Sequence, residues 1–80
     1  MQTTKYQLRH PIQIDGRTVQ EINLRRLTVG DLEVMQHEQS DLGKSIQAIA
    51  LSAQLSPEEV RLLDAEDFTQ LGEVLGGFFG

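Results

Sequence analysis

The hydrophobic period of this chain changes across the stretch from Leu24 to Leu32, LRRLTVGDL. Before it, apolar residues alternate with polar ones, as in a half-buried strand, and after it they recur at the spacing of amphipathic helices. Strands followed by helices predict an α+β domain. We expect an N-terminal two-stranded antiparallel β-hairpin (about residues 5–26), followed by three to four short α-helices within residues 28–79.

Length and composition limit the size of the core. The 80 residues are enough for one domain, 1–80, and 39% of them are hydrophobic but only 5% aromatic. A core built mainly from Leu, Ile and Val leaves little apolar surface for a deep ligand pocket.

Several classes of protein are disfavoured by the composition. The chain has no Cys, which removes disulfides, thiolate metal sites and cysteine nucleophiles. No segment resembles a signal peptide or reaches the roughly 20 apolar residues of a membrane span. The net charge of −5 opposes binding to nucleic acid. We therefore expect a cytoplasmic protein with no nucleic-acid or membrane partner.

The first predicted strand carries its apolar residues at even positions, Tyr6, Leu8, Ile12 and Ile14. A two-residue loop at the following Asp15-Gly16 would direct Ile22 and Leu24 to the opposite face, because a one-residue slip in register reverses the face of a strand. A three-residue loop with Gly16 in a bulge pairs Leu8 with Ile22 and Tyr6 with Leu24. We predict this bulged loop.

Two positions in the hairpin interrupt the pattern. Pro11 cannot donate to a ladder, which favours an edge or an irregular segment. His10 has no Cys or second His at metal spacing, so we interpret it as a surface or strand-edge histidine and predict no metal site.

Arg26 would face the core if the second strand continued. We expect the strand to end near Arg25, or Arg26 to pair with an acid.

Capping residues mark the predicted helix starts. Thr28 with Asp31 predicts a helix from Val29 to Gln39, and Ser40-Asp41 starts the next one. This second helix has one apolar stripe, made of Leu42, Ile46, Ile49, Ala50 and Ala53.

A third predicted helix spans Pro57 to Leu63, since Ser56, Pro57 and Glu59 form a capping box with Pro at N1. Asp64 with Asp67 looks like the cap of a last helix, whose shared face is Phe68, Leu71, Leu75 and Phe78.

The acidic cluster before the last helix does not suggest an active site. We interpret its five members, Glu58, Glu59, Asp64, Glu66 and Asp67, as helix starts and a solvated face rather than a carboxylate pair. The chain has no nucleophile elbow, phosphate loop, dinucleotide fingerprint or metal-spaced histidine set. We predict no enzyme activity, no catalytic residue, no cofactor and no metal.

The C-terminal end combines glycine with two phenylalanines, Phe78 and Phe79. Adjacent glycines weaken a helix, and an apolar end needs a place to pack. These side chains either fold back on the core or contact another subunit or partner.

The order of these segments resembles the small tail assembly chaperones of Mu-like contractile-tailed phages and prophages. The similarity lies in residues 5–12 with Asp15-Gly16, in the stretch Leu24 to Leu32, in residues 55–60 and 63–68, and in the glycine-containing end. The resemblance implies a non-enzymatic factor that binds the tape-measure protein and keeps it soluble during tail morphogenesis. It also implies that a longer form can arise by ribosomal frameshifting near the end of the reading frame.

The resemblance transfers no client-binding motif, so the protein-binding candidates follow from apolarity alone. They are Phe78, Phe79, Leu75, Tyr6 and Leu8. A homo-oligomer is a further expectation, because a second hairpin could cover the open edge of the first. Two alternatives to a chaperone are a small structural tail component retained in the particle and an acidic prophage adaptor or DNA mimic.

Overall fold

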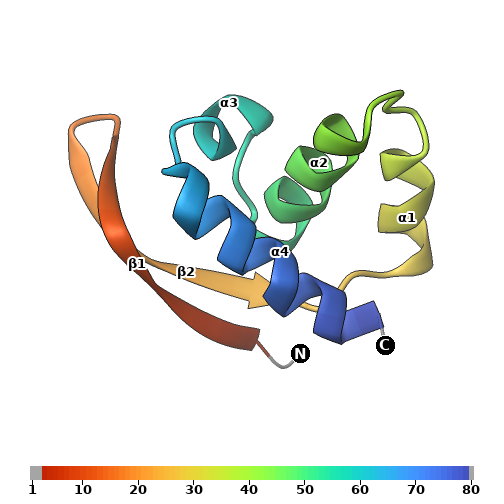
Figure 1. The fold of residues 1–80 in the computed structure, drawn as a ribbon, viewed down its shortest axis with the longest axis horizontal. Helices are drawn as coiled ribbons and strands as arrows, with labels where there is room; N and C mark the ends of the chain where they lie inside the picture. The colour runs from red at the N-terminus through yellow and green to blue at the C-terminus, as the bar shows by residue number, and fades with distance from the viewer. Residues whose placement is uncertain (1–2, 80) are drawn as a thin grey trace.

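The computed structural model describes residues 3–79, and the side chains of residues 3–76. A two-stranded antiparallel hairpin precedes four helices, which confirms the predicted α+β fold class (Figure 1). The elements are β1 (Thr3–Ile14), β2 (Arg17–Arg25), α1 (Val29–Met35), α2 (Asp41–Ala53), α3 (Pro57–Val60) and α4 (Ala65–Phe79).

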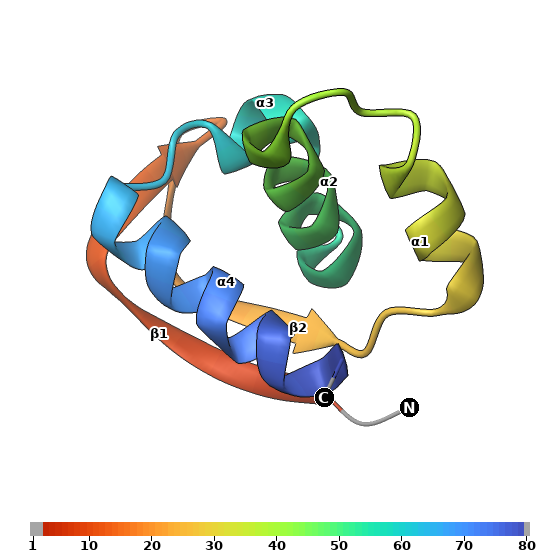
Figure 2. The ribbon, with the colours of Figure 1, turned by 45° about the vertical axis from the view of Figure 1, so that its right-hand side comes forward.

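The helices cover one face of the hairpin, as Figures 1 and 2 show from two directions. Helix α4 packs against β1, α2 packs against β2, and α1 and α3 both pack against α2. Buried apolar residues fill the space between the hairpin and the helices: Leu8, Ile12, Ile14, Ile22, Leu24, Ala48, Ile49, Ala50, Val60, Leu63, Leu71 and Leu75. The core is aliphatic, as the composition predicted.

The hairpin turn differs from the predicted one. Ile14 lies directly opposite Arg17, so Asp15 and Gly16 form a two-residue loop, and their φ angles of 51° and 78° match a type I′ turn. The predicted bulge at Gly16 is therefore wrong. The twist of this turn matches that of paired strands without an extra residue.

The register changes inside β1 instead. Gln7 pairs with Glu21 and Ile12 with Val19, so the four residues 8–11 of β1 lie opposite Gln20 alone. Strand β1 therefore has three residues more than β2 in this segment. Because three is an odd number, the side chains of the paired residues beyond it change from one face of the hairpin to the other, which is the effect expected of the predicted bulge. The predicted pairs, Leu8 with Ile22 and Tyr6 with Leu24, are therefore wrong, because the observed partners in β1 lie two residues earlier in the chain.

The observed cross-strand partners are Tyr6 with Ile22 and Thr4 with Leu24. Leu8, Ile22 and Leu24 are nevertheless buried together, as the alternation predicted. Pro11 lies within the irregular segment, where its missing N–H breaks no ladder.

Three helices begin at the predicted caps. Thr28, Ser40 and Ser56 are N-caps whose side chains accept from the backbone N–H three residues ahead. Local side-chain chemistry was sufficient to place these starts, because a cap bonds only to neighbours in the chain.

The helix ends were less well predicted. Helix α1 stops at Met35 rather than Gln39, and α3 stops at Val60 rather than Leu63. In both places the backbone continues with tighter hydrogen bonds three residues apart, His37 N to Val34 O and Leu63 N to Val60 O.

Leu42 is a further correction. It was placed on the buried stripe of α2, but its side chain is 62% exposed. The first turn of α2 borders a surface groove that Leu42 lines with Ile46 and Phe68, so the buried part of the helix lies nearer its C-terminal end.

Strand β2 ends at Arg25, as predicted, and Arg26 is exposed. The buried hydroxyl of Ser52 donates to the carbonyl oxygen of Arg25 over 2.6 Å, which joins α2 to the end of the strand. Within residues 3–79, none of the helices has the length and hydropathy needed to cross a membrane.

Candidate protein-binding surface

Helix α1 leaves an unusual amount of apolar surface in solvent. Its side chains Val29, Leu32 and Val34 are 81%, 36% and 42% exposed. Val29 and Leu32 lie on one side of the helix at three-residue spacing, whereas Val34 lies on another side. Three exposed large apolar residues on a seven-residue helix favour a contact with a partner over a surface that stays in solvent.

Helix α1 packs against α2 and is also held by polar contacts. The guanidinium of Arg25 donates two hydrogen bonds to Asp31, at 2.7 and 3.0 Å, and Thr28 and Asp31 form the capping box of α1. Hydrogen bonds from Arg25 are the main reason that the pKa of Asp31 lies well below its usual range. The apolar side chains are thus displayed on a well-held element.

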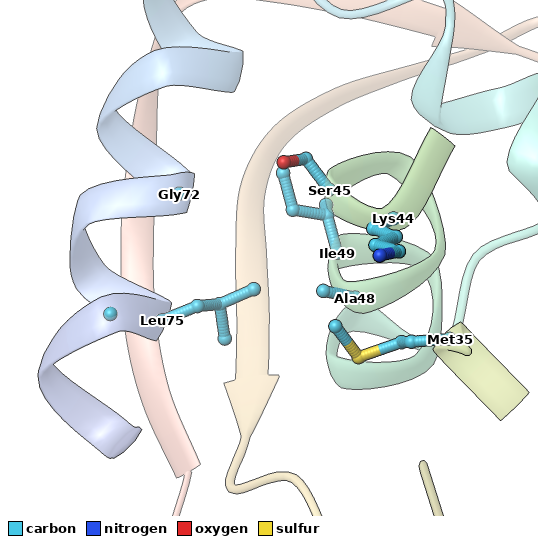
Figure 3. Close-up of a pocket in the computed structure, with 8 residues that line it drawn as sticks. Met35, Lys44, Ser45, Ala48, Ile49, Gly72 and Leu75 are labelled. Atoms are coloured by element: carbon cyan, nitrogen blue, oxygen red, sulfur yellow. The ribbon is translucent and has the colours of Figure 1, made fainter. Parts of the chain in front are cut away.

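A groove of about 160 Å³ lies beside α1, between this helix, α2 and α4 (Figure 3). Met35 from α1, Ala48 and Ile49 from α2, and Leu75 from α4 line it. Figure 3 shows these side chains converging on the space between α2 and α4. We call the exposed residues Val29 and Leu32 together with this groove the α1 surface.

A second apolar groove, of about 220 Å³, lies near the start of α4. Leu42, Ile46, Val60 and Phe68 are among the residues that line it. It contains one strongly exposed large residue, Leu42, whereas α1 carries three exposed ones.

The predicted binding residues occupy different surroundings. Leu8 and Leu75 are buried, and Leu75 also lines the groove of the α1 surface. Tyr6 is half-buried, and the side chains of Phe78 and Phe79 lie outside the described residues. A single chain does not test contacts with a partner, so the binding role of these five residues stays a prediction.

Asp67 corrects the interpretation of the acidic cluster as a solvated face. Its carboxylate is fully buried and accepts hydrogen bonds of 3.0 Å from the backbone N–H groups of Arg9 and His10 and from the hydroxyl of Tyr6. Burial acts to raise the pKa of Asp67, but these three donors outweigh it and the pKa is lowered. Asp67 therefore binds the irregular segment of β1 to α4.

Three of the other members, Glu58, Asp64 and Glu66, are exposed, as predicted for a solvated face, and Glu59 is half-buried. Asp64 accepts from the N–H of Glu66 at 2.9 Å at the beginning of α4, and Glu59 closes the capping box of α3. His10 is exposed, as predicted, but it also lies 2.9 Å from Glu66 and 3.8 Å from Asp64. The sequence contained no signal for these contacts, because the partners are far apart along the chain.

The exposure of α1 does not follow from its sequence, since Val29, Leu32 and Met35 recur at a three-residue spacing that is also typical of a buried face. A signal was present in Val34, an apolar residue away from that stripe on a short helix. On a small α+β fold, the exposed apolar side chains of α1 favour a domain of the protein-binding class.

Comparison with known families agrees with that class. The family model described as phage tail assembly chaperone proteins, E, or 41 or 14, matches residues 5–80. The chain therefore belongs to the phage tail assembly chaperone family, which confirms the resemblance of its sequence and gives a tail protein as its general kind of partner. Searches of curated proteins and of solved structures returned no match.

Proposed function

We propose that this protein binds the tape-measure protein of its phage and keeps it soluble until the tail tube polymerises. The α1 surface is the proposed contact. The observation that carries this proposal is the exposure of Val29, Leu32 and Val34 on one well-held helix beside an apolar groove. Membership of the tail assembly chaperone family supplies the class of client.

The chemistry of the surface suits a helical client. An amphipathic helix buries its apolar face in a hydrophobic groove. The α1 surface contains such a groove, and Val29 and Leu32 add exposed apolar side chains for the same contact. Leu75 lines this groove, and Phe78 and Phe79 follow it closely in the sequence, so the proposal keeps these three predicted contact residues. The net charge of −5 would help the complex stay in solution.

The proposal describes a non-enzymatic protein that works in the host cytoplasm. It includes association with a second copy or with a longer, frameshifted form of the same chain. Reading the gene around the codons of Phe78 and Phe79 checks the last point, because a run of thymines there would permit slippage. A gene without any slippery run removes the longer form from the proposal.

Two other roles make different predictions. A structural tail component would remain in the finished particle, whereas a chaperone would be absent from it. An acidic adaptor or DNA mimic would not need a neighbouring tail gene. A tail tube gene before this gene and a tape-measure gene after it favour the chaperone.

Co-expression with the tape-measure protein tests the proposed contact. Val29→Asp places a charge on the α1 surface at the first residue of a helix, where an acid favours the helix dipole, so the fold should be kept. We expect this variant to leave much less tape-measure protein in the soluble fraction and in the purified complex.

Leu62→Asp is the matched control, because Leu62 is an exposed apolar residue that lines neither apolar groove. It should retain full binding, and Leu42→Asp reports on the second groove. If the wild-type chain neither binds the client nor changes its solubility, the chaperone proposal fails. If Leu42→Asp alone abolishes binding, the contact lies at the second groove instead.

A further inference from the structure

Three side chains from two distant parts of the sequence meet on the surface where β1 and α4 touch. They are His10, Asp64 and Glu66, and their nearest ligand atoms all lie within 4.8 Å of one another. This group takes no part in the α1 surface. One imidazole nitrogen and two carboxylate oxygens form a donor set that suits a transition-metal dication.

The distances agree with ligands around one ion. The Nε2 atom of His10 lies 2.9 Å from Oε1 of Glu66 and 3.8 Å from Oδ1 of Asp64. Ligand atoms around a tetrahedral zinc ion with bonds of about 2.0–2.2 Å lie roughly 3.3–3.6 Å apart. The two separations from His10 bracket that range, and the third pair, Asp64 with Glu66, lies within 4.8 Å, so the three exposed side chains need to move inward to enclose an ion.

The backbone that carries these ligands is held in place from the inside. The buried carboxylate of Asp67 accepts from the N–H of His10 at 3.0 Å, and Asp67 follows Glu66 in the same helix. The position of His10 relative to the start of α4 is therefore fixed by a buried contact that does not use the imidazole. Such support reduces the ordering that an ion must impose on its ligands.

The electrostatics of the group favour a cation at the imidazole. The carboxylates of Glu66 and Asp64 lie 2.9 and 3.8 Å from its Nε2 atom, and the carboxylate of Asp67 accepts from the backbone N–H of the same residue. Arg9 is the other cation nearby, and its guanidinium lies 3.8 Å from Oε2 of Glu66, which leaves Oε1 for a second positive charge.

We propose that His10, Asp64 and Glu66 bind one Zn²⁺ ion, with water completing its coordination. The imidazole favours Zn²⁺ over Mg²⁺ and Ca²⁺, which prefer oxygen ligands alone. Zn²⁺ binds a neutral imidazole nitrogen, so protons compete with the ion and binding weakens as the pH falls. Bound metal would tie β1 to the start of α4.

Zinc titration of the full-length chain tests this site. Isothermal calorimetry at neutral pH should give one ion per chain, and the melting temperature should rise with Zn²⁺ and return after EDTA is added. Mg²⁺ and Ca²⁺ at equal concentration should leave the melting temperature unchanged. In NMR spectra, the imidazole signals of His10 should move with Zn²⁺.

His10→Ala should weaken Zn²⁺ binding by more than roughly tenfold, since even outer partners of a metal ligand contribute that much. It should still fold, because alanine keeps the backbone N–H that donates to the carboxylate of Asp67. Asp64→Asn is a second variant that keeps an oxygen for the N–H of Glu66. Circular dichroism verifies the fold of both variants.

His37→Ala is the matched control, because His37 is exposed and lies outside this group. It should bind Zn²⁺ as the wild type does. Absence of saturable binding, or binding that survives in His10→Ala, overturns the proposed site. Equal loss in His37→Ala also overturns it.

Discussion

The guanidinium of Arg25 and the carboxylate of Asp31 form a two-point ion pair, with nitrogen–oxygen distances of 2.7 and 3.0 Å. The same carboxylate accepts from the backbone N–H of Thr28 at 2.7 Å. One side chain thus caps α1 and fastens this helix to the end of β2. The orientation of the α1 surface depends on this pair.

Removal of the arginine should be costly because Asp31 would remain with part of its charge unmatched. We expect Arg25→Met to lower the free energy of unfolding by about 2–3 kcal/mol, measured by urea denaturation. Arg61→Ala is the control, since Arg61 pairs with Glu58 at 3.9 Å on the exposed surface and should matter by less than about 0.5 kcal/mol. Equal losses in the two variants would show that Arg25 has no special role.

Stability should fall in acid. The pKa values of Asp31 and Asp67 are lowered in the folded protein, so each carboxylate contributes stability that is fully present above its unfolded value of about 3.9. This contribution is lost as the pH falls from that value through the folded pKa. Urea denaturation between pH 5 and pH 2 should show the decline, with a shallower slope in Asp31→Asn. An unchanged slope in that variant would contradict the assignment.

The contacts of Asp67 should make it one of the most sensitive polar residues. Asp67→Ala leaves the N–H groups of Arg9 and His10 without their acceptor, and we expect a loss of about 2–4 kcal/mol in the free energy of unfolding. Tyr6→Phe removes one of the three donors and should lower it by about 1 kcal/mol. Glu73→Ala, at an exposed position of α4, serves as the control and should change little. Tolerance of Asp67→Ala would contradict the role of this carboxylate.

Two glycine substitutions should have opposite effects. Gly16 has a φ of 78° in the hairpin turn, so Gly16→Ala should lower the free energy of unfolding by about 1–2 kcal/mol. Gly72 is in α4, and an added Cβ would meet no atom within 4 Å, so Gly72→Ala should raise it by about 0.5–1 kcal/mol. Thermal melts of both variants check the signs. A loss of stability in both would contradict the helical placement of Gly72.

Features that depend on neighbours in the chain were predicted well. The caps at Thr28, Ser40 and Ser56 were correct because each side chain bonds to a backbone group three residues away. The end of β2 at Arg25 was also correct, since one more paired residue would have directed Arg26 toward the core. The ends of α1 and α3 were less certain in the sequence because they lack a glycine or proline stop.

Features of the candidate site were predicted only in part. Apolarity drew attention to Leu75, which lines the groove of the α1 surface, but it also placed the exposed Leu42 on the buried stripe of α2. A helical period shows which residues share a side of a helix, and it does not show whether another element covers that side. The exposure of Val29 and Leu32 became visible only in the folded chain.

By itself, the sequence determined the order of elements, the starts of α1, α2 and α3 and, through its resemblance, the family. Only the tertiary structure decided where the hairpin shifts register and what Asp67 does. His10 and Asp67 are 57 residues apart, and the buried carboxylate accepts N–H groups from the irregular part of β1. Local patterns do not encode such a contact, because it exists only when α4 packs against β1 and water is excluded between them.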